Sequence, residues 1–147
     1  LKILTKGRAT LAARCLGAME RILEESVTFA KQRVTMGKPI AQHQMIQAYL
    51  AEMATDIAAS RALTYHVAAL ADQGKRIIKE AAMTKLFVTE AFGRVADKGV
   101  QIHGGIGYMR DTPVERLYRD ARITRIYEGT SEIQKLIISN QLLQEYP

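Results

Sequence analysis

The stretch KRIIKEAAMTKLFVTEAFGRVADK, residues 75–98, decides the fold class of this chain. Apolar or small residues recur in it at intervals of three and four, at positions Ile77, Ala81, Thr84, Val88, Phe92 and Val95. That period is typical of an α-helix that buries one face. Alanine and glycine also cluster in the segment, which favours close approach of a neighbouring helix. We therefore predict a packed helix over residues 75–98 that stops before Gly99.

Three other segments have the same helical period. They cover residues 10–33, 42–72 and 131–145. The first is expected to end at the turn Met36-Gly37-Lys38-Pro39, and the second at Gly74. In the last segment, the residues expected to face inward are Ile133, Leu136, Ile137, Asn140 and Leu143.

A shorter helix is predicted between the third and fourth long ones. Thr112, Pro113 and Glu115 stand in the order of an N-cap, a first helical residue and a capping-box partner. No segment alternates apolar and polar residues between hairpin turns, so few or no strands are expected. The fold class that follows is all-α. It is an antiparallel four-helix-bundle-like domain with a short extra helix, formed by residues 1–147 as one domain.

The composition narrows the classes of partner. The chain has 21 Lys and Arg against 15 Asp and Glu, a formal net charge of +6 that favours anionic partners. Arginines are frequent between Arg110 and Arg125, but acidic residues lie among them and few aromatic residues are placed for base stacking. Nucleic-acid binding is therefore not expected. Charged residues interrupt every apolar stretch, which predicts no membrane span.

The cysteine and histidine content argues against a metal site. Cys15 is the single cysteine, so the sequence offers neither an internal disulfide nor a cysteine pair for zinc. This pattern fits a reducing compartment, with Cys15 as a core residue. The three histidines, His43, His66 and His103, are far apart and form no metal-binding motif. The chain begins at Leu1, so further residues are expected upstream.

Residues 99–130 break the helical period and contain the candidates for chemistry. Glu128 stands directly before Gly129; a glutamate in a loop is usually solvated, but a following glycine allows close approach of a ligand. The glycine cluster HGGIG, residues 103–107, lacks the spacing of a dinucleotide fingerprint or a P-loop. It is either a tight corner between helices or a surface of backbone amides for a cofactor. Arg33 either complements a helix dipole or binds a ligand phosphate.

Three ordered motifs resemble the C-terminal helical domain of the acyl-CoA dehydrogenase family, over essentially the whole chain. The first is QRVTMGKPI at residues 32–40, followed by Gln44, and the second is QIHGGIGY at 101–108. The third and most specific runs from PVER at 113–116 through RDARI at 119–123 to IYEGTSEIQ at 126–134. The resemblance implies a flavoprotein oxidoreductase of fatty acid metabolism with FAD as its cofactor.

The resemblance also implies the catalytic step. Glu128 would remove a proton from the α-carbon of an acyl-CoA thioester while the β-hydrogen passes as hydride to flavin N5, giving a trans-2-enoyl-CoA. Some members of the family carry this base at the position of Gly7, which has no carboxylate, so Glu128 is expected to act. Gly129 is expected to lie against the thioester, and Arg8 on the substrate side. No catalytic role is expected for His103.

Contacts to FAD are implied for two further sets of residues. The larger set comprises Arg33, Thr35 and Gln44, at the FAD of a neighbouring subunit, with Gln101, Gly104 and Gly105 at the adenosine-diphosphate half of that FAD. The smaller set, Thr130 and Glu132, would touch the flavin nucleotide.

Partners and location follow from the same resemblance. It implies an acyl-CoA substrate, an electron-transferring flavoprotein as acceptor, and a homodimer or homotetramer. The location would be the cytoplasm of a bacterium or the mitochondrial matrix of a eukaryote. The family's N-terminal helical domain and middle β-domain are not part of this chain, which is therefore expected to be inactive alone. Two alternatives stay open: a non-catalytic helical interaction module of the same fold, and an acyl-CoA oxidase that passes electrons to oxygen.

Overall fold

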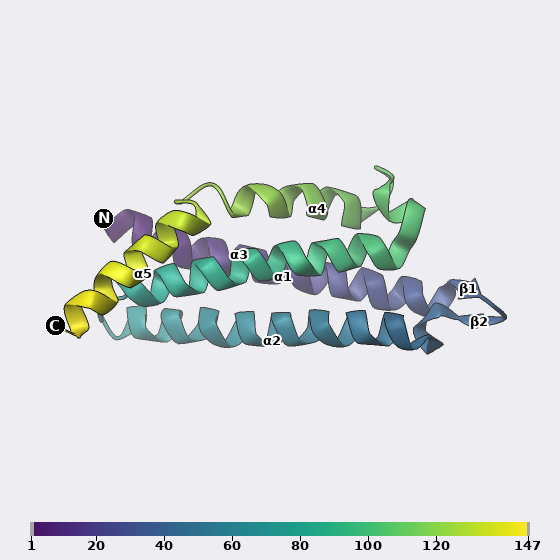
Figure 1. The fold of residues 1–147 in the computed structure, drawn as a ribbon, viewed down its shortest axis with the longest axis horizontal. Helices are drawn as coiled ribbons and strands as arrows, with labels where there is room; N and C mark the ends of the chain where they lie inside the picture. Colours follow the sequence, from purple (N-terminus) through teal and green to yellow (C-terminus); the bar gives the residue numbers. More distant parts are fainter. Residues whose placement is uncertain (1, 147) are drawn as a thin grey trace.

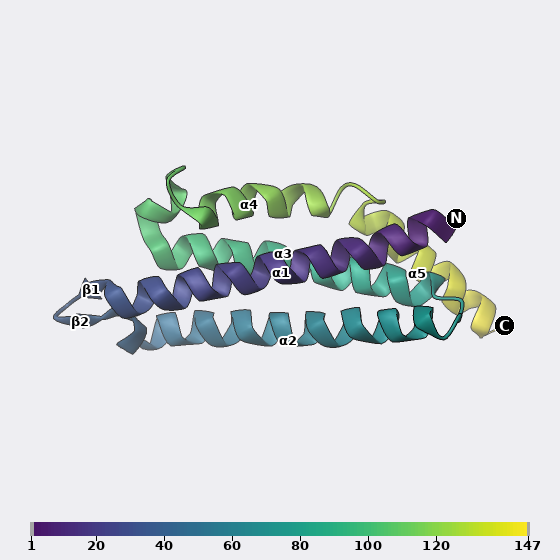
Figure 2. The same cartoon turned by 180° about the vertical axis from the view of Figure 1, so that it is seen from behind.

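The structure is a computed structural model that describes residues 2–146, and the side-chain surroundings of residues 5–146. Three long helices lie side by side: α1 (Lys2–Gln32), α2 (Gln44–Asp72) and α3 (Ile78–His103). The shorter α4 (Pro113–Thr124) lies along α1 and α3, on the side away from α2 (Figures 1 and 2). The last helix, α5 (Ser131–Glu145), packs on α3 at the end of the bundle where both termini lie (Figure 1). The predicted all-α class is confirmed.

A short β-ribbon joins α1 to α2 at the other end of the bundle (Figure 1). Its strands β1 (Val34–Thr35) and β2 (Lys38–Pro39) are antiparallel. Met36 and Gly37 connect them with φ angles of 50° and 78°. Two consecutive positive φ angles are typical of the tight turns that match the twist of a hairpin. The 3₁₀ helices η1 (Ile40–Gln42) and η2 (Gly104–Tyr108) lie at this same end, after β2 and after α3.

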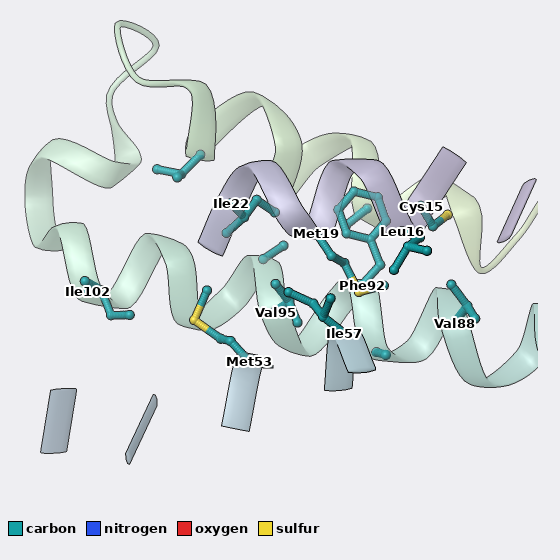
Figure 3. Close-up of a cluster of buried hydrophobic side chains, with 14 of the residues drawn as sticks. Cys15, Leu16, Met19, Ile22, Met53, Ile57, Val88, Phe92, Val95 and Ile102 are labelled. Atoms are coloured by element: carbon teal, nitrogen blue, oxygen red, sulfur yellow. The ribbon is translucent and has the colours of Figure 1, made fainter. Parts of the chain in front are cut away.

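The core runs along the seam between α1, α2 and α3 (Figure 3). All six residues of the predicted stripe, Ile77 just before α3 and the other five within it, are buried, which confirms the face inferred from the period. Met19 and Ile22 of α1 meet Met53 and Ile57 of α2 in the same cluster. Cys15 is also buried, and burial raises the pKa of its thiol to about 11. The expected core role of Cys15 is confirmed.

The bounds of two helices differ from the prediction. The first helix begins at Lys2 rather than near residue 10. The third begins at Ile78 rather than at residue 75, and it does not stop before Gly99 but continues to His103. A Cβ atom at Gly99 would overlap the Ile22 side chain of α1. Gly99 therefore serves close approach of α1 and α3 rather than helix termination.

The predicted inward face of the last helix is wrong, although its bounds are correct. Ile133, Leu136 and Leu143 are 44%, 59% and 70% exposed, whereas Ser131 and Gln134 are the buried residues. The reason is that α4 occupies the side of α1 and α3 where a fourth bundle helix would pack. Only the first turn of α5 is buried, so most of its apolar residues face away from the described part of the chain.

Candidate active site

The loop between α4 and α5 has an unusual backbone. Glu128 has a φ angle of 58° and Gly129 one of 92°, both in the left-handed region. A non-glycine residue in this region costs on the order of 1 kcal/mol or more and persists only where its surroundings hold it. The sequence singled out Glu128 as a candidate, and the structure adds that the left-handed backbone angle lies on this residue.

Three side chains hold the carbonyl groups of this loop. Gln134 Nε2 donates to the carbonyl oxygens of Glu128 and Gly129, at 3.2 Å and 2.9 Å. Lys85 Nζ donates to the Gly129 carbonyl at 2.8 Å, and Arg8 Nε to the Glu128 carbonyl at 3.4 Å. These donors come from α5, α3 and α1, so the loop is fastened to three helices at once.

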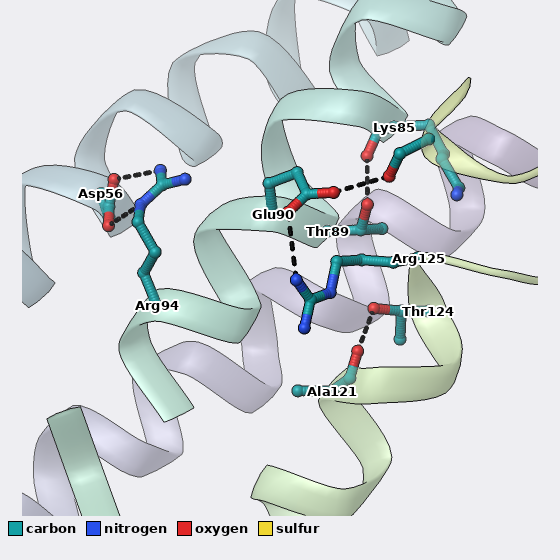
Figure 4. Close-up of polar contacts among 9 residues, drawn as sticks. Asp56, Lys85, Thr89, Glu90, Arg94, Ala121, Thr124 and Arg125 are labelled. Atoms are coloured by element: carbon teal, nitrogen blue, oxygen red, sulfur yellow. Dashed lines mark hydrogen bonds and ion pairs between the residues drawn. The ribbon is translucent and has the colours of Figure 1, made fainter. Parts of the chain in front are cut away.

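A second set of contacts holds both ends of the loop to α3 (Figure 4). Glu90 accepts a hydrogen bond from Ser131 Oγ at 2.6 Å and pairs with Arg125 at 3.3 Å. Arg125 lies across Gly93, where a Cβ would come within 3.3 Å of the guanidinium carbon. The glycine thus makes room for the arginine. The loop is therefore fixed at both of its ends and at its centre.

The carboxylate of Glu128 lies over Gly7 in the first turns of α1. A Cβ atom at Gly7 would come within 2.9 Å of Glu128 Oε2. Glu128 is exposed, whereas Arg8 beside it is buried. The two positions at which family members are expected to carry the base therefore adjoin one another in space.

Thr130 and Glu132 stand at the start of α5, close to Glu128 along the chain. Thr130 is the N-cap of α5 and accepts a hydrogen bond from the Ile133 amide at 3.4 Å. Hydrogen bonds from the backbone at the helix start and from Thr130 lower the pKa of the Glu132 carboxyl. The N-cap is thus Thr130, while the neighbouring Ser131 donates to Glu90 instead.

The other expected cofactor residues lie at the ribbon end of the bundle. Arg33, Thr35, Gly104 and Gly105 line one open hollow of about 610 Å³. Gln44 and Gln101 do not line it, although both are exposed on the helices nearby. The structure therefore brings together four of these six residues.

The hollow has the features that an anionic cofactor needs. Nothing lies within 4 Å of a Cβ built on Gly104 or Gly105, so the backbone there is open to a ligand. Arg33, which lines the same hollow, supplies a cation. These residues fit the diphosphate of FAD.

Two histidines make contacts within the fold at the ribbon end of the bundle. His43 Nε2 lies 3.3 Å from Thr35 Oγ1 and connects the ribbon to the start of α2. His103 stacks on Phe29 at 4.4 Å between ring centroids, and its Nδ1 lies 2.8 Å from the Gly99 carbonyl oxygen.

The described residues contain no group of three or more His, Cys, Asp or Glu that could hold a metal ion. None of the helices within residues 2–146 is long and apolar enough to cross a membrane.

Comparison with known proteins decides the family. The family model described as "Acyl-CoA dehydrogenase, C-terminal domain" matches residues 1–143. The chain belongs to the acyl-CoA dehydrogenase family. It is 54% identical over 140 residues to an acyl-CoA dehydrogenase of Bacillus subtilis, a match that covers 95% of this chain and 37% of that protein. The match to the acryloyl-CoA reductase (NADH) of Anaerotignum propionicum is 46% identical over 144 residues and covers 98% of this chain and 36% of that protein.

Solved structures agree with the family assignment. The butyryl-CoA dehydrogenase of Megasphaera elsdenii superposes with a TM-score of 0.93 at 42% sequence identity. That superposition covers 95% of this chain and 37% of the solved one. The chain therefore spans little more than a third of the length of these relatives.

Sequence reasoning missed two buried residues that hold the loop of this acyl-CoA dehydrogenase domain. Lys85 and Gln134 are both completely buried. The available signal for Lys85 is its position directly beside the apolar stripe of residues 77–95, where a lysine is uncommon. Gln134 stands at the end of the motif IYEGTSEIQ that carries the family resemblance, but its contacts to the loop depend on the tertiary structure.

Proposed function

We propose that this chain supplies the catalytic base for FAD-dependent α,β-dehydrogenation of an acyl-CoA thioester. The observation that carries the proposal is the loop of Glu128, whose strained backbone is held by side chains from three helices. Such fixation of the backbone supports a role in which the carboxylate is held ready to remove an α-proton. A glutamate without a chemical role would not need this support.

The surroundings of Glu128 suit its role as a base. Its carboxylate is exposed here, so it is accessible to a substrate that then excludes water from it. The backbone N–H of Glu128 donates to no acceptor recorded among the described residues, and it is free to bind the thioester carbonyl oxygen. A donor at that oxygen stabilises the negative charge that develops when the α-proton leaves. FAD, when bound, accepts the β-hydrogen as a hydride.

We propose that the expected FAD residues serve two different copies of the chain. Thr130 and Glu132 lie beside Glu128, whereas Arg33 and Thr35 lie at the ribbon end (Figure 1). Along α3 the two ends are about 27 Å apart, from Lys85 under the loop to His103 at the hollow, at 1.5 Å per residue. A flavin held beside Glu128 would therefore take its second set of contacts from a neighbouring copy, which supports a homodimer or homotetramer.

The proposed function also includes the electron acceptor, the direction of the reaction and the cellular location. We assign an electron-transferring flavoprotein as acceptor; one structural neighbour, with a TM-score of 0.94 at 42% sequence identity, is named for such a protein of Acidaminococcus fermentans. Because one relative is named a reductase, the reaction should be assayed in both directions. The site of action would be the cytoplasm of a bacterium or the mitochondrial matrix of a eukaryote.

The first prediction tests the base. In the complete enzyme that contains this chain, Glu128→Gln keeps the shape of the side chain but cannot accept the α-proton. We expect turnover of acyl-CoA thioesters to fall by about 10³-fold or more while the flavin spectrum and flavin content stay unchanged. Turnover is measured with a panel of thioesters of different chain length, by monitoring the bleaching of the flavin absorbance. The absorption spectrum of the resting enzyme gives the flavin content.

The matched control is Glu24→Gln. Glu24 is exposed in the C-terminal third of α1, and its only recorded interaction among described residues is a weak pair with Arg21 at 3.8 Å. This variant should keep full turnover. Normal turnover of Glu128→Gln would refute the proposed base, and loss of flavin from that variant would show a structural role instead.

A further inference from the structure

Lys85 is a buried cation that the mechanism above does not use. It lies in α3, and no part of its side chain is exposed. No carboxylate of the described residues lies within 4 Å of its ammonium group. A buried charge without a paired carboxylate is costly, because it loses the hydration that stabilises it in water. A lysine at such a position calls for a specific acceptor.

The recorded acceptor for this ammonium among the described residues is the carbonyl oxygen of Gly129, at 2.8 Å. A hydrogen bond from a charged donor is about twice as strong as one between neutral groups, and burial strengthens it further. Burial also lowers the pKa of Lys85, while the negative potential of Glu90 and Glu132 opposes this effect. The interaction thus ties the loop to the most buried helix of the bundle.

The position of this carbonyl is important because of the backbone around it. Glu128 and Gly129 both have left-handed φ angles, and a relaxed loop would leave that region. The Gly129 carbonyl belongs to the peptide that follows the second of these residues. A donor fixed in α3 that holds this oxygen therefore also limits the backbone angles of Glu128.

We propose that Lys85 is a positioning residue for the reaction, and that its buried ammonium group holds the Gly129 carbonyl so that the Glu128 carboxylate stays over Gly7. The proposal rests on the proposed role of Glu128 as the base. Gln134 shares the task, because its amide donates to both carbonyl groups of the loop. Lys85 differs from Gln134 in two ways. It carries a charge, and it belongs to α3, a helix held in place by α1, α2 and α4, whereas Gln134 belongs to α5.

The second prediction tests this role in the complete, flavin-loaded enzyme. Lys85→Met keeps an unbranched side chain of similar length and removes the ammonium group. Because a displacement of about 1 Å at a reacting group can cost about 10²-fold, we expect kcat to fall by about that factor with KM for the thioester unchanged. Flavin content should also stay unchanged.

The readout that separates positioning from mere stability is amide hydrogen exchange. Mass spectrometry of the holoenzyme should show faster exchange in the peptide that covers residues 126–134, with little change in the rest of α3. Lys98→Met is the matched control, because Lys98 lies in the same helix, is largely buried and pairs with Glu52 at 3.1 Å. The control should leave both kcat and loop exchange as they are.

Several outcomes would overturn the proposal. It fails if Lys85→Met matches Lys98→Met in kcat while Glu128→Gln is inactive. It also fails if Lys85→Met loses flavin and thermal stability but keeps normal turnover per bound flavin. If Glu128→Gln is active, the proposed base is wrong, whereas loop exchange still decides whether Lys85 holds the backbone. Lys85→Gln covers the case in which methionine prevents folding, because its amide is polar but one bond too short to replace Nζ at the Gly129 carbonyl; the same split between kcat and KM is expected.

Discussion

Gly7 and Glu128 are separated by most of the sequence, yet one leaves room for the other. A side chain at residue 7 would occupy the space of the Glu128 carboxylate. The atoms that would collide belong to the tip of a flexible, exposed side chain, which can move aside at little cost in folding energy. Gly7 is therefore important for the position of the carboxylate rather than for the stability of the fold.

The third prediction follows at this residue. Gly7→Ala should raise the free energy of unfolding by up to about 1 kcal/mol, because alanine favours a helix over glycine. The same change should lower turnover of the complete enzyme, because the Glu128 carboxylate is displaced. Urea unfolding and steady-state kinetics measure the two effects.

Gly17→Ala provides the comparison within the same helix. Nothing lies within 4 Å of a Cβ at Gly17, so this variant should gain similar stability and keep its turnover. Equal turnover of the Gly7 and Gly17 variants would contradict the inferred contact between Gly7 and Glu128.

Among the elements, α3 has the central place, because it contacts α1, α2, α4 and α5. Its apolar stripe forms the core with α1 and α2, while Lys85 and Glu90 hold the loop of the candidate site. The same rigid helix thus supports both packing and chemistry. Close contact with α1 depends on Gly99, where the two helices leave no space for a side chain.

The fourth prediction concerns this seam. Gly99→Ala should destabilise the chain by about 1–3 kcal/mol, since the new methyl group overpacks against Ile22. Adding Ile22→Ala removes the Cγ2 methyl group that overlaps, so the double variant should be more stable than the sum of the two single changes predicts. Chemical unfolding of all four proteins completes the cycle. Strict additivity would argue against a direct clash between these residues.

In the whole molecule, the two groups of expected cofactor residues occupy opposite ends of the bundle (Figure 1). A separation of this size is hard to reconcile with one flavin bound by a single copy. It suits a symmetric assembly in which each site takes residues from two copies. The exposed apolar residues of α5, which include Leu136 and Leu143, add surface that this chain leaves uncovered.

The fifth prediction tests shared sites by complementation in the complete enzyme. Arg33→Ala should lose flavin and Glu128→Gln should lose turnover, so each variant alone is inactive. Co-expression of the two should restore about a quarter of the wild-type turnover, because half of randomly formed pairs are mixed and each mixed pair contains one intact site.

A second mixture provides the control for this experiment. Lys85→Met and Glu128→Gln alter the same end of the molecule, so mixed pairs contain no site free of both changes. That mixture should show no recovery beyond the residual turnover of Lys85→Met. Absence of recovery in the Arg33 mixture as well would mean that the sites are not shared between copies.

The sequence by itself determined the class of fold and the family. Helical periods arise from local spacing, so the buried stripe of α3 and the bounds of α5 could be read directly from the residues. The motif around Glu128 could also be recognised in the sequence, because the family resemblance depends on the order of residues along the chain. The inward face of α5 was misread for the same reason, since local period cannot tell which neighbour a helix will find.

Only the tertiary structure decided which residues support the candidate base. Lys85 meets the Gly129 carbonyl across 44 residues of sequence, and Arg8 meets the Glu128 carbonyl across 120. The sequence predicted a helix end at Gly99, whereas in the structure this glycine lies inside α3 and allows close contact with α1. Such contacts depend on how whole helices pack, and packing is a property of the assembled bundle rather than of any one segment.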